Sequence, residues 1–143
     1  MIAYFDTSAI VPLLIQEAGT DRAQAQWVAA DRVVTVRLAE VEARAALAQA
    51  QRTARLTAAQ CEASASALLQ LLEQAAFVDI DEELVSHAGQ LAQTRALRAY
   101  DAVHLAAAIS VQDDDLVVVA GDTALLAAAA GEGLSTSSTS PST

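Results

Sequence analysis

Residues 2–10 read IAYFDTSAI, and the aspartate at position 6 lies between two apolar runs. The first run, IAYF, is short and rich in β-branched and aromatic residues, which predicts a buried strand. A carboxylate taken out of water without a partner costs several kcal/mol even after relaxation. We therefore expect Asp6 to be hydrogen-bonded, protonated or bound to a cation, and other parts of the chain must meet it.

Short apolar segments of the same kind recur along the chain, separated by alanine- and leucine-rich stretches with helical spacing. Further strands are expected at residues 33–36 (VVTV), 77–80 (FVDI) and 116–120 (LVVVA). Helix starts are marked by Thr20, Thr57, Asp81 and Asp122, which favour N-caps. The expected helices cover residues 20–30, 38–52, 57–74, 84–95, 100–110 and 123–130. This alternation predicts an α/β three-layer sandwich, with a short central parallel sheet flanked by helices.

Length and composition favour one domain. A chain of 143 residues can bury a full core without disulfides or metal. We expect a single domain over residues 1–134 and a disordered tail at 135–143 (STSSTSPST), because the tail has no apolar residue to bury. The lone cysteine, the lack of a secretory-signal pattern and the lack of an apolar run of about 20 residues predict a cytoplasmic protein without membrane association.

The chain is strongly acidic: 18 acidic residues against eight arginines and no lysine give a net charge of −10. An acidic surface repels phosphate at long range, so binding of nucleic acid has to be local or bridged by cations. The charge therefore points to metal or a basic partner. A solvated acidic surface that keeps a protein soluble explains the same charge.

Four acidic residues occupy positions where a ligand is expected. Asp6 follows the first strand and Asp122 follows the last, and open parallel sheets bind ligands at the carboxyl ends of their strands. Asp101 is the only acid in the apolar stretch RAYDAVHLAAAI, and Glu42 lies on the helix after the second strand. Carboxylates in one pocket raise one another's pKa unless a cation neutralises them, and hard oxygen ligands suit magnesium or manganese.

Each of these residues also has a purely structural explanation. Asp6, Asp101 and Asp122 all stand where a helix N-cap is expected. Glu42 could lie on a solvated face and pair with an arginine for about 0.3 kcal/mol. His104, one helical turn after Asp101, is expected to be a hydrogen-bonded core residue rather than a catalytic one.

Four segments, taken in order, resemble the PIN domain, and in particular the short VapC-type toxins of bacterial toxin–antitoxin pairs. They are DTSAIVPLL (6–14), EARAALAQA (42–50), LRAYDAVHLAAA (97–108) and VVVAGDTALLAAAAGEGL (117–134). The resemblance covers nearly the whole chain up to residue 134. It implies a ribonuclease that binds Mg²⁺ or Mn²⁺, and a VapB-type antitoxin that holds it inactive.

The resemblance assigns the metal-binding and catalytic positions residue by residue. They are Asp6, Glu42, Asp101 and Asp122, with Thr7 or Ser8 as a hydroxyl near the metal. The chain departs from the family pattern in three places. These are Ala120, where many relatives have threonine, Val36, where serine is common, and the Ser/Thr-rich stretch where a final short strand usually follows.

Glu40 and Glu42 compete for one place in the site. Two residues on a helix are separated by about 200°, so both side chains cannot enter one pocket. The glutamate helix of the resembling family begins as EARAALA does, which favours Glu42. Arg98 could contact a substrate phosphate or pair with an acid. Tyr4 and Tyr100 are too few for a base-stacking platform.

These residues allow metal-assisted hydrolysis of phosphodiester bonds. We expect a metal-dependent ribonuclease with an RNA substrate, a cognate VapB-type antitoxin and a homodimeric state. The alternative is a catalytically decayed PIN-like fold that acts as a binding or interaction module, with the acids structural. A receiver domain would need a lysine, which is absent, and a haloacid-dehalogenase-like phosphatase would need a second acid at position 8, which is serine.

Overall fold

The computed structural model describes residues 1–141, which fold around one parallel sheet of five strands in the order β3-β2-β1-β4-β5. The strands are β1 (Ile2–Phe5), β2 (Arg32–Val36), β3 (Ala75–Val78), β4 (Leu116–Ala120) and β5 (Ser135–Ser138). The helices are α1 (Thr7–Leu14), α2 (Thr20–Ala29), α3 (Leu38–Arg52), α4 (Ala58–Glu73), α5 (Glu82–Thr94), α6 (Ala99–Ser110) and α7 (Thr123–Gly131).

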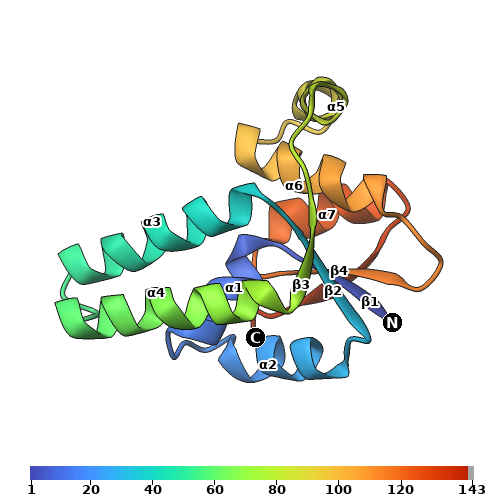
Figure 1. Ribbon diagram of the computed structural model, residues 1–143. Coiled ribbons are helices and arrows are strands. Elements are labelled where there is room, and N and C mark those ends of the chain that lie inside the picture. Colours follow the sequence, from blue (N-terminus) through green and yellow to red (C-terminus); the bar gives the residue numbers. More distant parts are fainter. Residues whose placement is uncertain (142–143) are drawn as a thin grey trace.

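Helices cover both faces of the sheet (Figure 1). Successive strand residues point to opposite faces, so Tyr4 packs in a core formed with α5, α6 and α7, and Phe5 packs in a core formed with α1, α3 and α4. A third cluster, around Leu47, joins α3 to α4. These two helices lie side by side and extend away from the sheet (Figure 1). The predicted three-layer α/β sandwich is confirmed.

The prediction of a disordered tail from residue 135 is wrong for residues 135–141. Residues 135–138 form β5, which pairs with β4 in parallel, and Thr139 N donates to Ala120 O at 3.0 Å. Gln26 Nε2 also donates to Ser137 Oγ at 3.0 Å. An edge strand is held by main-chain hydrogen bonds and tolerates polar side chains, so its composition does not reveal it. Residues 142 and 143 of the predicted tail lie outside the described residues.

The third strand also differs from its prediction, because it lies at 75–78 rather than 77–80. Its register is set by backbone pairing with β2, in which Ala75 lies opposite Val33 and Val78 opposite Val36. Ile80 falls beyond the strand and is 41% exposed. The prediction followed the apolar residues of FVDI and missed that the strand begins with two alanines, which pair with β2 through their main chain.

Most predicted helix starts are observed. Thr57 forms a capping box at α4, and Asp81 accepts from Leu84 N at 2.8 Å to cap α5. Thr20 is not a cap, since its hydroxyl donates to Pro12 O at 2.6 Å and Gly19 is the N-cap residue of α2. None of the helices in residues 1–141 combines the length and the apolar character that crossing a membrane requires.

Candidate active site

The carboxyl edge of the sheet carries two aspartates that begin helices. Asp6 directly follows β1, and its Oδ2 accepts from Ser8 N at 3.0 Å, which caps α1. Asp122 follows β4 after one glycine, and its Oδ1 accepts from the main-chain nitrogens of Ala124 at 2.9 Å and Leu125 at 3.2 Å, which caps α7. Both residues are therefore caps. A cap uses only one oxygen of each carboxylate, so capping does not exclude a ligand role.

Asp101 lies in the first turn of α6 but does not cap it. The N-cap residue of α6 is Arg98, and no side chain closes this helix end. The Asp101 side chain is 17% exposed, and its Oδ2 lies 3.4 Å from Arg98 Nε. Burial raises the pKa of Asp101, and the negative charges of Asp122 and Asp6 raise it further against the opposing effect of Arg98. Asp6 and Asp122 are therefore close enough to Asp101 for their charges to act on it.

Glu42 reaches the same region from α3. Its Oε1 accepts from Thr7 Oγ1 at 2.8 Å and lies 2.6 Å from His104 Nε2. Glu40 instead pairs with Arg44, at 3.4 Å from Nε, on the exposed side of the helix. The helix thus places Glu42, rather than Glu40, toward Asp6 and Asp101.

His104 is the residue whose part in the site the sequence did not reveal. Its side chain is 1% exposed, with Nδ1 at 2.9 Å from the Tyr4 hydroxyl and at 3.4 Å from Asp6 Oδ1. Burial lowers the pKa of His104, but the hydrogen bond to Glu42 and the charges of Asp6, Glu42 and Asp101 outweigh it, so the pKa is raised. Burial, together with the charges of Asp6 and Glu42, raises the pKa of Tyr4 well above its usual range. Tyr4 is therefore a protonated hydroxyl at neutral pH.

Both hydroxyl residues expected near the metal contact an acid. Thr7 donates to Glu42, while Ser8 Oγ donates to Asp6 Oδ2 at 2.5 Å and accepts from Gly121 N at 2.8 Å. Ser8 therefore ties the start of α1 to the corner between β4 and α7.

The C-terminal segment supports this corner from the other side. Ser140 Oγ donates to Gly121 O at 3.1 Å, and Thr139 packs against Gly121 with only 2% of its own surface exposed. The corner at which the sequence departs from the family pattern is thus held by Ser8 and by residues 139–140.

The acids fit a divalent cation in chemistry, although their present positions do not form a complete ligand set. Carboxylate oxygens are the ligands that Mg²⁺ and Mn²⁺ prefer, and a cation would relieve the repulsion that contributes to the raised pKa of Asp101. In residues 1–141, no group of three or more His, Cys, Asp or Glu side chains is arranged to hold a metal ion. Binding an ion therefore requires the carboxylates to move closer together, with the oxygens that their present donors leave free as the available ligands.

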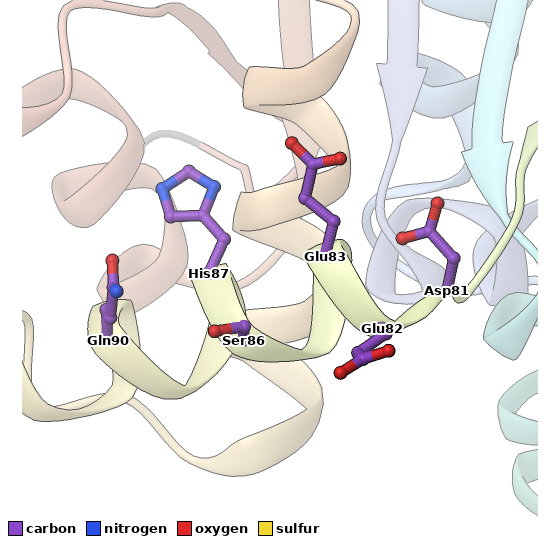
Figure 2. Close-up of a pocket in the computed structure, with 6 residues that line it drawn as sticks. All are labelled: Asp81, Glu82, Glu83, Ser86, His87 and Gln90. Carbon is purple, nitrogen blue, oxygen red and sulfur yellow. The ribbon is translucent and has the colours of Figure 1, made fainter.

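A surface hollow with a volume of about 650 Å³ lies elsewhere, over the first half of α5. Figure 2 shows the side chains of Glu83, His87 and Gln90 pointing to one side of the helix and that of Glu82 to the other. The residues that line this hollow all belong to α5 or to its N-cap residue, Asp81. The candidate site lies instead at the sheet edge, where Asp6 after β1 and Asp122 before α7 meet residues of α3 and α6.

Comparison of the sequence with known protein families and relatives identifies its family. The PIN domain model matches residues 3–131. The chain belongs to the PIN domain family. This PIN domain is 40% identical over 121 residues to "Ribonuclease VapC49" of Mycobacterium tuberculosis (strain ATCC 25618 / H37Rv), which covers 85% of the chain and 84% of the relative. The resemblance inferred from the four sequence segments is confirmed.

Solved structures agree with the fold. This PIN domain superposes on FitAcB from Neisseria gonorrhoeae with a TM-score of 0.71 at 21% identity, over 97% of this chain and 98% of that one. A toxin–antitoxin complex from Klebsiella pneumoniae gives a TM-score of 0.61 at 17% identity, over 85% and 87% of the two chains. At these sequence identities, the structural similarity supports the fold alone.

Proposed function

We propose that this PIN domain is a divalent-metal-dependent ribonuclease and the toxin of a VapBC-type toxin–antitoxin pair. The observation that carries the proposal is the position of Asp6, Asp101 and Asp122 at the carboxyl edge of the sheet, where the charges of Asp6 and Asp122 act on Asp101. The 40% identity to a protein named as a ribonuclease, across 85% of the chain, supports RNA as the substrate.

Four acids would hold the ion: Asp6, Glu42, Asp101 and Asp122. A bound Mg²⁺ or Mn²⁺ would supply Lewis-acid chemistry there, because such an ion lowers the pKa of a coordinated water and neutralises charge on phosphate oxygens. Asp6 and Asp101 are the proposed direct ligands. Glu42 ligates or orients water, and Asp122 acts directly or through water.

The remaining polar residues orient these acids and the substrate. Ser8 fixes one oxygen of Asp6 by two hydrogen bonds, and Thr7 and His104 fix one oxygen of Glu42. The side chain of Arg98 is 86% exposed, and its contact with Asp101 is long, at 3.4 Å. A guanidinium in that position can turn to an RNA phosphate, which offsets the repulsion between the acidic protein and its substrate.

The proposed protein partner is a VapB-type antitoxin. A structure with the same fold is described as a toxin–antitoxin complex, and the net charge of −10 favours a basic partner. The homodimeric state and the cytoplasmic location stay predictions.

The test is cleavage of a structured RNA by the full chain with Mn²⁺, compared with the same reaction in a chelator. Asp101→Asn should abolish cleavage. Asp114→Asn, a change at an exposed acid in the loop before β4, should leave it within a few-fold of the parent. Absence of cleavage with either Mn²⁺ or Mg²⁺ in a folded protein would favour the decayed interaction module instead.

A further inference from the structure

His104 makes more contacts with the candidate site than a residue that only fills the core. It lies on α6 and reaches β1, α1 and α3 through its two ring nitrogens. Nδ1 meets the Tyr4 hydroxyl at 2.9 Å and Asp6 Oδ1 at 3.4 Å. Nε2 meets Glu42 Oε1 at 2.6 Å and Thr7 Oγ1 at 3.2 Å. The ring therefore bridges two of the proposed metal ligands, Asp6 and Glu42.

The direction of the bond to Glu42 follows from the chemistry of the two groups. An ionised carboxylate only accepts hydrogen bonds, so Nε2 carries the hydrogen that lies between His104 and Glu42. The single hydroxyl hydrogen of Thr7 also goes to Glu42. Both bonds fall on Oε1, which leaves Oε2 as the oxygen for an ion.

We propose that His104 is a positioning residue that anchors the Glu42 carboxylate through Nε2, in the orientation from which Glu42 serves the metal site. The inference rests on the proposed function, because Glu42 is a metal ligand or water-orienting group only there. A glutamate side chain has three torsions, and that of Glu42 is 21% exposed. A buried donor that fixes one of its oxygens therefore lowers the conformational entropy that is lost when an ion binds. Donors behind metal ligands typically change metal affinity by about 10–100-fold when they are removed.

Two substitutions separate the bond to Glu42 from the mere presence of a buried polar side chain. His104→Gln places its amide near the former Nε2 position and keeps a donor for Glu42. His104→Asn is one methylene shorter, so its amide lies near the former Nδ1 position, within reach of Tyr4 and not of Glu42. Glu40→Gln is the control for a charge change on the outer side of α3.

Mn²⁺ binding to the full chain, followed by the paramagnetic resonance of free Mn²⁺, is the primary measurement. We expect His104→Asn to weaken Mn²⁺ affinity by about 10–100-fold, and His104→Gln and Glu40→Gln to stay within about threefold of the parent. Equal affinity in the folded His104→Asn variant and the parent would overturn the inference alone. So would equal weakening in the Asn and Gln variants, since that assigns the effect to ring shape. A parent chain that binds no Mn²⁺ would refute the proposed function, and this inference with it.

A second measurement needs no variant to fold. The ¹⁵N spectrum of the imidazole in the parent chain should show a protonated Nε2 whose shift changes when Mg²⁺ is added. An unprotonated Nε2, or an Nε2 signal indifferent to Mg²⁺ that binds elsewhere in the same titration, would overturn the anchoring role.

Discussion

The substitutions Glu42→Gln and Glu40→Gln are both nearly isosteric and both lie on α3, but we expect them to differ in their effects on stability and on RNA cleavage. Glu42 Oε1 accepts from Thr7 at 2.8 Å and from His104 at 2.6 Å, and its side chain is 21% exposed. Glu40 has one contact of 3.4 Å with Arg44, and its side chain is 48% exposed. The pair therefore separates a carboxylate with buried donors from one in solvent, at constant side-chain shape.

The contacts set the expected magnitudes. A hydrogen bond to a charged group stabilises by about 1.5–3 kcal/mol and a neutral one by about 0.5–1.5 kcal/mol, so Glu42→Gln should cost the metal-free protein about 1–2 kcal/mol. An exposed pair four residues apart on a helix stabilises by about 0.3–0.5 kcal/mol, which is the limit for Glu40→Gln. In a chain of this size, 1 kcal/mol changes the melting temperature by about 3 °C. We therefore expect a loss of about 3–6 °C for Glu42→Gln and about 1 °C for Glu40→Gln.

Two assays check these values. Thermal melts in a chelator measure the metal-free stability, and Mn²⁺-dependent cleavage of a structured RNA measures the function. Glu42→Gln should abolish cleavage, while Glu40→Gln should leave it within a few-fold of the parent. The opposite ranking of the two variants would refute the assigned role of Glu42 and the composition of the site. Unchanged melting in Glu42→Gln would refute the energetic part of the reasoning.

The other predictions concern metal, Asp101 and the Gly121 corner. Mn²⁺ at 100 times its dissociation constant should raise the melting temperature by about 8 °C, since a ligand at that ratio adds about 2.7 kcal/mol, and an intact fold that shows no shift at millimolar Mn²⁺ would contradict the site. Asp101→Asn should remove that shift and leave the metal-free protein equally or slightly more stable, because two neighbouring acids no longer repel the side chain; a retained shift would show that Asp101 is no ligand. Gly121→Ala should lower the free energy of unfolding by about 1 kcal/mol, because its Cβ comes to 3.1 Å from a threonine hydroxyl of the C-terminal segment. Its control, Gly89→Ala, meets nothing within 4 Å on α5 and should stabilise by up to about 1 kcal/mol, so equal melting of the two alanine variants would argue against tight packing at the corner.

The parts of the fold that the sequence predicts are those with a strong local pattern. Residues 38–52 form α3 with the predicted bounds, because alanine and leucine recur there at helical spacing. The strands at 2–5 and 116–120 are also as predicted, since each is a short apolar run between polar residues. The strand at 135–138 was missed because its partner is the backbone of β4, and main-chain pairing leaves no mark in a run of serine and threonine.

The sequence named the four acids and the hydroxyls of Thr7 and Ser8, but it did not indicate that His104 holds Glu42. The positions after β1 and β4 lie at one edge of the sheet in any parallel arrangement, so Asp6 and Asp122 could be placed from topology alone. The bond from His104 to Glu42 depends on how α6 faces α3, which local pattern does not fix. One signal was present: a histidine in an apolar helix must find partners for both nitrogens, and the acids predicted nearby were suitable partners.

The four acids differ in how completely the protein already satisfies them, and this difference indicates where an ion acts most strongly. Asp6 receives two hydrogen bonds from Ser8, Asp122 receives two from main-chain amides, and Glu42 is held by Thr7 and His104. In residues 1–141, no buried side-chain nitrogen or oxygen lacks a hydrogen-bond partner. Within residues 1–141, Asp101 has only the long side-chain contact with Arg98, and burial together with the charges of Asp122 and Asp6 raises its pKa. A cation therefore gains most by replacing the weak contact at Asp101, because the other three acids already have good donors on one oxygen. For this reason, neutralising Asp101 should remove metal binding at the smallest cost to the metal-free fold, whereas neutralising Glu42 disturbs both.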